Sequence, residues 1–308
     1  VSLLGLSHGS AVALRYASTF PGHTGAVVLD GYSDPDLPPP QRELEQISAF
    51  ERQLDELLVE CAFSDGCPLE GPDPGASIDR LLDELDEAPM SLGDGRRLIE
   101  ADLYEAITGA LMRGPAAHQR LLGAIADAGD GDGSALHGMA EQFRRDFVAS
   151  GLDLGTFMAI TCVDDGAAWA QLGGEQVEGL SARIAEAAPR LGRWLWSPPV
   201  ADDLPLLGLC AMVPAKPEAP ESDAGPFLGT GAGPVLILAA SGDPATPFSG
   251  AVLAAEELED GRLLAIRADQ HLVYPQAVAT PNASTSRCVL EAVEAHLVTG
   301  GPPPPGGC

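Results

Sequence analysis

The pentapeptide Gly-Leu-Ser-His-Gly at residues 5–9 constrains the fold of this chain more than any other feature. The apolar run before it, residues 1–4, is typical of the end of a buried strand, and segment 9–20 (GSAVALRYASTF) has the pattern of a helix. Glycines that flank a serine between a strand and a helix allow a sharp turn that exposes the serine hydroxyl. The pattern predicts that Ser7 is a nucleophile and that the main-chain N–H of His8 faces an oxyanion.

Strand and helix patterns alternate at both ends of the chain. Segment 24–29 (TGAVVL) predicts a second short strand. Near the other end, the apolar runs 234–239 (PVLILA) and 262–266 (RLLAI) predict buried parallel strands, separated by a helical pattern over 251–258. Between these two regions, helical periodicity dominates residues 41–196. The order is sheet, long helical insertion, then sheet again, which predicts an α/β fold.

The helical insertion contains several separate helices. The clearest periodicities lie in segments 47–61, 78–85, 98–112 and 177–191, and a last helix outside the insertion begins within 291–297. The Gly/Asp run 129–133 predicts a loop.

Candidate partners for Ser7 follow the two late strands. A nucleophilic serine needs a base that takes its proton and an acid that orients the base. Asp243 comes just after the strand 234–239, and His271 just after the strand 262–266, in the order that an elbow-type serine requires. Asp30 and Asp34 follow an earlier strand and are alternative acids. The other histidines lie on predicted helices or beside them, where we expect surface positions: His23, His118, His137 and His296.

The charge limits the classes of partner. The chain has 45 acidic and 17 basic residues, a formal net charge of −28, and Lys216 is its one lysine. Such a surface disfavours nucleic acids and anionic membranes and is compatible with a cationic group such as a peptide amine. No apolar run in the sequence approaches the roughly 20 residues that span a bilayer.

The cysteines indicate an oxidising compartment. An even set of six predicts three disulfides, and six buried free thiols are the alternative. No Cys-x-x-Cys occurs and no histidine is spaced for a zinc finger, so we expect neither a metal nor a cofactor. The cysteines are Cys61, Cys67, Cys162, Cys210, Cys288 and Cys308.

Several segments together resemble a known family. The sequence is similar to the secreted α/β-hydrolase serine peptidases of the tripeptidyl aminopeptidase group, relatives of the proline iminopeptidases, including their characteristic C-terminal region. The resemblance rests on segments LLGLSHGSAVALRYASTFPGHTGAVVLDGYSDP, FERQLDELLVECAFSDGCPL, AITCVDD, PVLILAASGDPATP and the tail from Cys288 to Cys308.

The resemblance implies an α/β-hydrolase fold in which this chain supplies the C-terminal part of the parallel sheet and a large helical cap insertion. The implied divisions are a hydrolase core at 1–34, a cap at 35–200 and a return to the core at 201–308. Ser7, Asp243 and His271 take the roles of nucleophile, acid and base. His8 stands where an aromatic residue is common, and Gln270 where glycine is usual.

The cysteines and the cap carry further expectations. We expect the disulfides Cys61–Cys67, Cys162–Cys210 and Cys288–Cys308. Cap residues of such enzymes hold the free N-terminus of the substrate, often through carboxylates. Asp164 and Asp165 are the candidates here because they follow Cys162, which a disulfide would fix, and a solvated acidic turn is the alternative.

The resemblance further implies that the chain begins within the strand that feeds the nucleophile. The second oxyanion donor, earlier strands and any leader would then lie upstream. The implied activity is release of short peptides from substrate N-termini by a secreted or cell-envelope enzyme. An esterase with the same three residues, and a non-catalytic exported binding protein or inactive fragment, are the alternatives.

Overall fold

The computed structural model describes residues 1–69, 71, 73–151, 156, 168, 172–193, 225–304 and 307–308. The chain splits into two compact units. The sheet unit comprises Val1–Leu37 and Pro220–Cys308, and the helical unit comprises Pro38–Ala219. The chain thus leaves the sheet unit once and returns to it. The divisions follow residues 37 and 219, where the sequence suggests residues 34 and 200.

Within the described residues, the sheet unit contains a four-stranded parallel sheet with the order β1-β2-β5-β6. Its strands are β1 (Leu3–Leu6), β2 (Val27–Asp30), β5 (Val235–Ala240) and β6 (Gly261–Ile266). Every residue of β2 and β5 is buried. The carboxyl ends of parallel strands meet at one edge of a sheet, so the loops that follow these strands share that edge.

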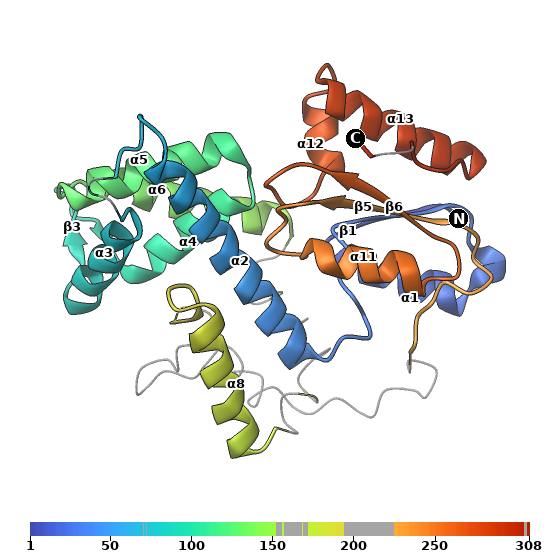
Figure 1. Ribbon diagram of the computed structural model, residues 1–308, viewed down its shortest axis with the longest axis horizontal. Helices are drawn as coiled ribbons and strands as arrows, with labels where there is room; N and C mark the ends of the chain where they lie inside the picture. Colours follow the sequence, from blue (N-terminus) through green and yellow to red (C-terminus); the bar gives the residue numbers. More distant parts are fainter. Residues whose placement is uncertain are drawn as a thin grey trace. The chain divides into compact units, whose positions relative to one another are not determined.

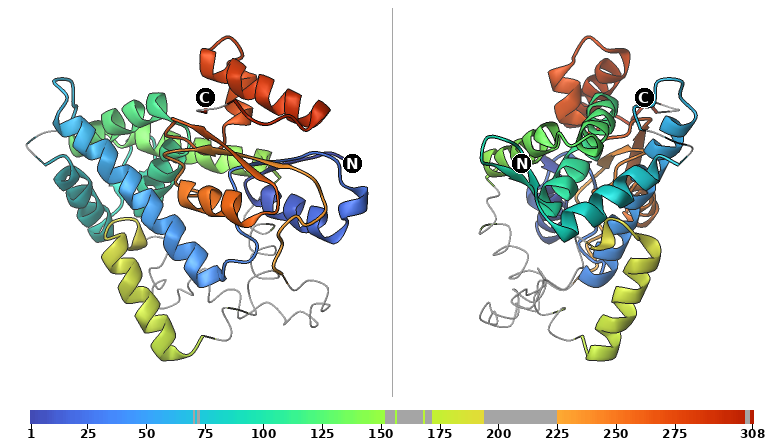
Figure 2. Two further views of the ribbon diagram at one scale, coloured as in Figure 1. Left: turned by 45° about the vertical axis from the view of Figure 1, so that its right-hand side comes forward. Right: turned by 90° about the vertical axis from the view of Figure 1, so that its left-hand side faces the viewer.

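Helices cover both faces of this sheet (Figures 1 and 2). On one face lie α1 (His8–Thr19) and α11 (Phe248–Glu257), and on the other α12 (Tyr274–Ala279) and α13 (Ser284–Thr299). A separate apolar cluster joins each pair of helices to the sheet. Burial of both faces explains why the strands have continuous apolar sequences rather than alternating ones.

The last helix is longer than its sequence pattern indicates. It begins at Ser284 rather than within 291–297, because its first turn consists of small polar residues that give no apolar periodicity. A short 3-10 turn, η1 (Pro21–His23), follows α1 and leads toward β2.

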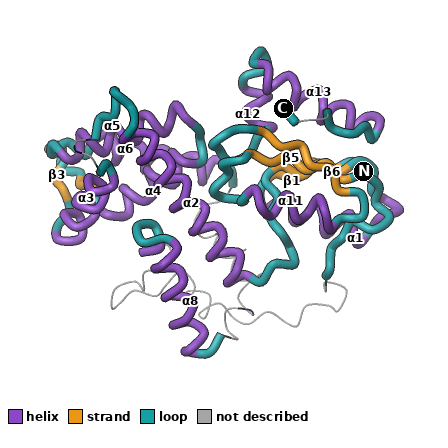
Figure 3. Tube along the Cα trace, viewed as in Figure 1, coloured by secondary structure: helices purple, strands orange, loops and turns teal. Residues whose placement is uncertain are grey.

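Within the residues that the structure describes, the helical unit consists of helices and one short antiparallel hairpin (Figure 3). The hairpin pairs β3 (Met90–Ser91) with β4 (Arg97–Leu98). The helices are α2 (Pro39–Ala62), α3 (Gly75–Glu87), α4 (Glu100–Leu111), α5 (Pro115–Gly129), α6 (Ser134–Ala149) and α8 (Gly174–Ala187). The sequence predicted four of these by periodicity. It did not single out α5 and α6, whose many alanines and glycines blur the contrast between polar and apolar faces.

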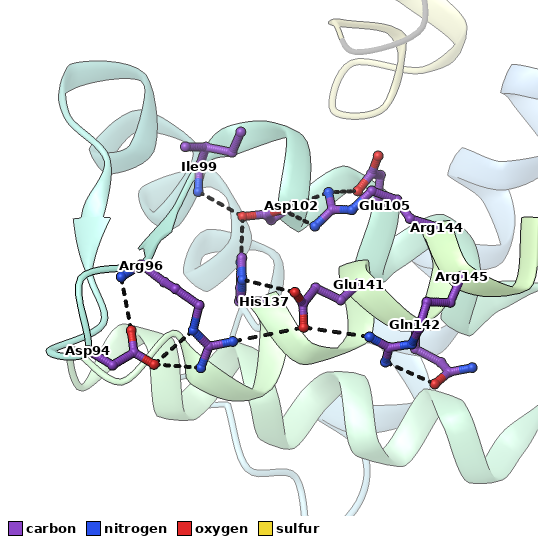
Figure 4. A network of polar contacts seen from close by, with 10 residues as sticks. All are labelled: Asp94, Arg96, Ile99, Asp102, Glu105, His137, Glu141, Gln142, Arg144 and Arg145. Atoms are coloured by element: carbon purple, nitrogen blue, oxygen red, sulfur yellow. Dashed lines mark hydrogen bonds and ion pairs between the residues drawn. The ribbon is translucent and has the colours of Figure 1, made fainter. Parts of the chain in front are cut away.

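A polar network connects α4 to α6 (Figure 4). The side chain of Asp102 is 3% exposed, and its carboxylate accepts the N–H of Ile99 at 3.2 Å. The same carboxylate lies 3.0 Å from Nδ1 of His137 and accepts a hydrogen bond from Arg144 at 2.9 Å. Arg144 also pairs with Glu105. Asp102 therefore caps the start of α4 and binds α6 to it.

The expected surface positions of the histidines are wrong for His118 and His296. Both side chains are buried on the inner faces of their helices. Each has a ring nitrogen beside a main-chain carbonyl, and Nε2 of His296 lies 3.0 Å from the carbonyl oxygen of Val27. The carbonyl beside His118 belongs to Leu111 at the end of α4, and the one beside His296 belongs to Val27 in β2, so neither partner follows from the periodicity of the helix that carries the histidine.

Two disulfides of the expected set are present in the described residues. Cys61–Cys67 joins the end of α2 to the loop after it, with a Cα–Cα distance of 4.8 Å. Cys288–Cys308 joins α13 to the C-terminal residue, with a Cα–Cα distance of 5.8 Å. The expected pair Cys162–Cys210 lies outside the described residues. Among the helices described above, we find none with both the length and the apolar character needed to cross a bilayer.

Candidate active site

Ser7 occupies the one-residue turn between β1 and α1. Its φ of 53° and ψ of −125° place a non-glycine residue in a conformation that side chains rarely adopt. The turn is anchored because the Ser7 N–H donates to the carbonyl oxygen of Asp30, at 2.8 Å. Strain of this kind persists only where the surrounding structure enforces it, and it concentrates at functional sites.

The two glycines of the pentapeptide differ in their steric roles. A Cβ at Gly5 would overlap the carbonyl oxygen of Gly9 and would lie 2.7 Å from Cα of Ser10, so the start of α1 needs glycine there. A Cβ at Gly9 would meet open space. Close packing of helix on strand therefore explains the first glycine, and the second has no such explanation in the structure.

The structure brings Ser7, His271 and Asp243 together within the sheet unit. Nε2 of His271 lies 2.9 Å from Oγ of Ser7, and Nδ1 of His271 lies 2.9 Å and 3.0 Å from the two carboxylate oxygens of Asp243. Ser7 follows β1, Asp243 follows β5 and His271 follows β6, all at the carboxyl edge of the sheet. The side chains of His271 and Asp243 are 6% and 2% exposed. This is the arrangement of nucleophile, base and acid that serine hydrolases use.

Comparison with known proteins agrees with this geometry. Residues 199–308 match the family described as TAP-like protein, an α/β-hydrolase family. Serine protease Hip1 of Mycobacterium tuberculosis is 30% identical over 321 residues, which cover 99% of this chain and 57% of that protein. The chain belongs to the α/β-hydrolases of the TAP-like group.

Two further relatives show the breadth of this hydrolase group. Carboxylesterase B of Mycobacterium tuberculosis is 30% identical over 298 residues, covering 92% of this chain and 52% of the relative. Putative hydrolase YuaR of Escherichia coli is 26% identical over 297 residues, covering 95% and 55%. The chain thus spans little more than half the length of the curated relatives it matches.

Main-chain and hydroxyl donors hold the carboxylate of Asp243 in place. One carboxylate oxygen of Asp243 accepts the N–H groups of Ala245 and Thr246, both at 2.9 Å, and the other accepts the Thr246 hydroxyl at 2.8 Å. Thr246 is not among the site residues predicted from the sequence. Its signal was present, since Asp-Pro-Ala-Thr after a strand favours a turn in which the aspartate side chain binds the following N–H groups.

Ser10 is a second polar residue that the sequence analysis missed. Its side chain is fully buried, and its hydroxyl donates to the carbonyl oxygen of Ser7 at 2.6 Å. The same hydroxyl accepts the N–H of Ser33 at 2.9 Å, and it lies 3.1 Å from the carbonyl oxygen of Gly31. Ser10 therefore joins the turn at Ser7 to the segment after β2. A buried serine in an otherwise apolar helix face was the available signal.

His8 is exposed and begins α1, so its main-chain N–H belongs to the helix N-terminus. The first N–H groups of a helix have no acceptor within the helix and favour an anion. This position suits the oxyanion role expected for the His8 N–H, while the imidazole itself has no part in the contacts around Ser7.

The alternative acids make other contacts. Asp34 accepts the N–H of Asp36 at 2.8 Å and the hydroxyl of Tyr32 at 3.4 Å. The Asp30 carboxylate accepts the N–H groups of Val273 and Tyr274. Neither occupies the position beside Nδ1 of His271 that Asp243 holds.

Burial raises the pKa of Asp30 to about 6. Its two main-chain hydrogen bonds and the charge of His271 act in the opposite direction, while the charge of Asp243 raises the pKa further. The fully buried carboxylate of Asp30 therefore takes up a proton at a higher pH than a free aspartate does. The expected amine anchors, Asp164 and Asp165, lie outside the described residues.

Proposed function

We propose that this protein is a serine hydrolase that releases short peptides from the N-termini of its substrates through an acyl-enzyme. The observation that carries the proposal is the line of hydrogen bonds from Ser7 Oγ through His271 to Asp243. The relative named a serine protease supports cleavage of peptides. The N-terminal specificity rests on the family resemblance described above.

The geometry supports a two-stage reaction. Ser7 Oγ attacks the scissile carbonyl carbon and transfers its proton to Nε2 of His271, and Asp243 stabilises the imidazolium that forms. The resulting oxyanion accepts the N–H of His8. His271 then protonates the leaving amine, the C–N bond breaks, and the acyl group remains on Ser7. His271 then takes a proton from a water molecule, whose oxygen attacks the acyl carbon. The bond from the acyl carbon to Ser7 Oγ breaks, and His271 returns the proton to Oγ.

The free amine of the substrate needs a counter-charge, and we propose the Asp164 and Asp165 carboxylates for that role. The acidic composition of the chain, with a formal net charge of −28, favours approach of a cationic terminus. We also propose that the protein acts outside the cytoplasm, because Cys61–Cys67 and Cys288–Cys308 are disulfides of the kind that persist in oxidising compartments.

A matched set of substrates tests this function in the full-length protein. We expect turnover of a tripeptide anilide with a free N-terminus and at least roughly tenfold lower kcat/KM for its N-acetylated form, since acetylation removes the positive charge that the proposed carboxylates would bind. Asp164→Asn or Asp165→Asn should raise KM for the free-amine substrate more than for the acetylated one. Equal effects on both substrates would remove these residues from the proposal.

Ester hydrolysis is the second candidate, because one relative is named a carboxylesterase. The three residues at the site do not fix the acyl group. Turnover of p-nitrophenyl butyrate without turnover of either tripeptide anilide would establish the esterase. A protein in which Ser7 does not react with a fluorophosphonate would be neither.

A further inference from the structure

The residue directly after His271 has a strained backbone. Leu272 has a φ of 65°, and within the described residues only it and Ser7 combine a side chain with a positive φ. A branched side chain in this left-handed region is a genuine outlier, which persists only where neighbouring groups enforce it. The two strained residues of the described chain are therefore the proposed nucleophile and the neighbour of the proposed base.

Asp30 binds the segment that follows this turn. The N–H of Val273 lies 3.0 Å from each carboxylate oxygen of Asp30, and the N–H of Tyr274 lies 2.7 Å from one of them. Asp30 is the last residue of β2 and is fully buried. Its carboxylate thus binds two consecutive N–H groups, one and two residues beyond Leu272, from a rigid position in the sheet.

Gln270 binds the turn from the other side. Its Nε2 donates to the carbonyl oxygen of Leu272 at 2.9 Å. The peptide group after Leu272 is therefore held at both ends, since its carbonyl oxygen accepts from Gln270 and its N–H, on Val273, donates to Asp30.

The end of β2 also approaches the turn closely. A Cβ at Gly31 would lie 2.8 Å from Cδ2 of Leu272 and 3.1 Å from Cε1 of His271. Gly31 has a φ of 68°, so both its conformation and this approach favour glycine. The Leu272 side chain and the His271 imidazole therefore both lie close against the end of β2.

We propose that Asp30 and Gln270 are positioning residues that hold the Leu272 turn and thereby keep the His271 imidazole between Ser7 and Asp243. The proposal rests on the proposed function for its effect on turnover. Neither residue touches the reacting atoms. Asp30 acts through the N–H groups of Val273 and Tyr274, and Gln270 acts through the carbonyl group of Leu272.

Two variants of the full-length protein test the proposal, with Glu51→Gln as the matched control. Asp30→Asn keeps the size of the side chain but places an amide NH2 group against the two N–H donors. Gln270→Ala removes the donor to Leu272 and changes a partly exposed residue, so it should fold even where Asp30→Asn does not. Glu51 is also a buried carboxylate that accepts two consecutive main-chain N–H groups, but these belong to Arg190 and Leu191 of the helical unit.

Kinetics give the first readout. We expect kcat to fall roughly 10- to 100-fold in Asp30→Asn and roughly 5- to 10-fold in Gln270→Ala, with KM changed less than about threefold, because small misplacements of a base cost rate rather than binding. The rate of fluorophosphonate labelling should fall in parallel. Glu51→Gln should stay within about twofold of wild type in both measurements. Variants that fold with wild-type kcat would overturn the proposal.

Substitution at the turn gives a sharper test. Asparagine tolerates a positive φ far better than leucine, so in a Leu272→Asn background the turn should need less support. The loss caused by Gln270→Ala should then shrink to within about twofold. An undiminished loss in that background would show that Gln270 does not act through the Leu272 turn.

A spectroscopic readout separates this proposal from the proposed function. The Nδ1–H proton of His271, bonded to Asp243, should give a far-downfield proton NMR signal. We expect it to shift or broaden in Asp30→Asn and Gln270→Ala and to stay unchanged in Glu51→Gln. If wild type hydrolyses nothing but the signal responds in this way, the proposed function fails and the positioning role stands. If the signal is unchanged in both variants, the positioning role fails whatever the activity.

Discussion

Asp30 in the sheet unit and Glu51 in the helical unit make similar hydrogen bonds in different surroundings. Each is a buried carboxylate that accepts two consecutive main-chain N–H groups, and burial raises the pKa of each. Glu51 lies on α2 and binds the turn after α8, where Arg190 provides a counter-charge at 3.7 Å. Asp30 binds the turn after His271, where the backbone is strained.

The difference shows how a buried carboxylate near an active site can be distinguished from one in a structural network. A raised pKa alone does not separate the two, because structural networks perturb pKa values as active sites do. The strained residues do separate them, since both non-glycine residues with positive φ in the described chain lie in the sheet unit: one is Ser7 itself and the other, Leu272, directly follows His271. The sheet unit combines buried polar groups with enforced strain, while the polar groups of the helical unit cap and connect helices.

The largest effect that we expect is a fall in kcat in variants that still fold. Ser7→Ala, His271→Ala and Asp243→Asn should each lower kcat by roughly 10³- to 10⁴-fold or more in the full-length protein, because the three residues act as a unit. Double variants should lose little beyond the single ones. Circular dichroism and unfolding curves would serve as controls for folding.

One measurement can contradict the role of Asp243 as the acid that orients His271. If Asp243→Asn keeps kcat within about tenfold of wild type, another carboxylate orients His271, and Asp30→Asn would then have to produce the larger loss.

Much of this site could be predicted from the sequence, for a local reason. Ser7, Asp243 and His271 each follow a strand with a clear apolar pattern, so their positions at the carboxyl edge of the sheet follow from the strand pattern and the chain order alone. Asp30 stands out by the same rule. Its partners Val273 and Tyr274, however, are more than 240 residues away in the sequence, so the same signal made it only an alternative acid.

Other features had no usable local signal. The positive φ of Leu272 depends on contacts from Gln270, Asp30 and the neighbouring Gly31, and leucine has no preference for that conformation. The burial of His296 likewise depends on a carbonyl oxygen of β2. Contacts between distant segments decide such details, and one sequence does not reveal them.

The next largest effect should be a loss of stability of the helical unit with no fall in the catalytic rate. Asp102→Ala leaves the buried end of the network in Figure 4 without its carboxylate, so the free energy of unfolding of this unit should fall by about 3 to 4 kcal/mol. The half-exposed Arg144 contributes less of this than a buried partner would. Asp94→Asn, at an exposed ion pair with Arg96, should leave the same free energy nearly unchanged, because solvent screens such a pair.

Urea unfolding and fluorophosphonate labelling together measure this contrast. A labelling rate that falls in Asp102→Ala as far as it does in Asp30→Asn would erase the distinction between the two units. A loss of stability no larger than that of Asp94→Asn would show that the network in the helical unit contributes little.

The two disulfides should also stabilise the two units unequally. Cys288 and Cys308 are separated by 20 residues and Cys61 and Cys67 by 6, so closing the loops lowers the entropy of the unfolded chain by different amounts. We expect losses of about 3 kcal/mol when Cys288 and Cys308 are both replaced by alanine, and about 2 kcal/mol for Cys61 and Cys67. Unfolding followed separately for each unit by hydrogen exchange would measure both. The reverse order would mean that strain or structure in the unfolded chain outweighs loop length.

An effect as small as the loss of the Cys61–Cys67 disulfide is expected from pH, because stability should depend on the protonation of Asp30. The pKa of Asp30 rises from 3.8 to about 6 on folding, so between these values the folded chain holds a proton that the unfolded chain has lost. The contribution of Asp30 to stability is therefore fully present below pH 3.8, falls as pH rises, and is lost through pH 6. Between pH 4 and pH 6 this amounts to about 2 kcal/mol. Hydrogen exchange of β2 and β5 amides, corrected for intrinsic rates, should show this decrease in wild type and not in Asp30→Asn, whereas Glu51→Gln should keep it in the sheet unit. If stability changed equally with pH in wild type and in Asp30→Asn, the carboxylate of Asp30 would not be the titrating group. The contrast between Asp30 and Glu51 would then be smaller than their surroundings suggest.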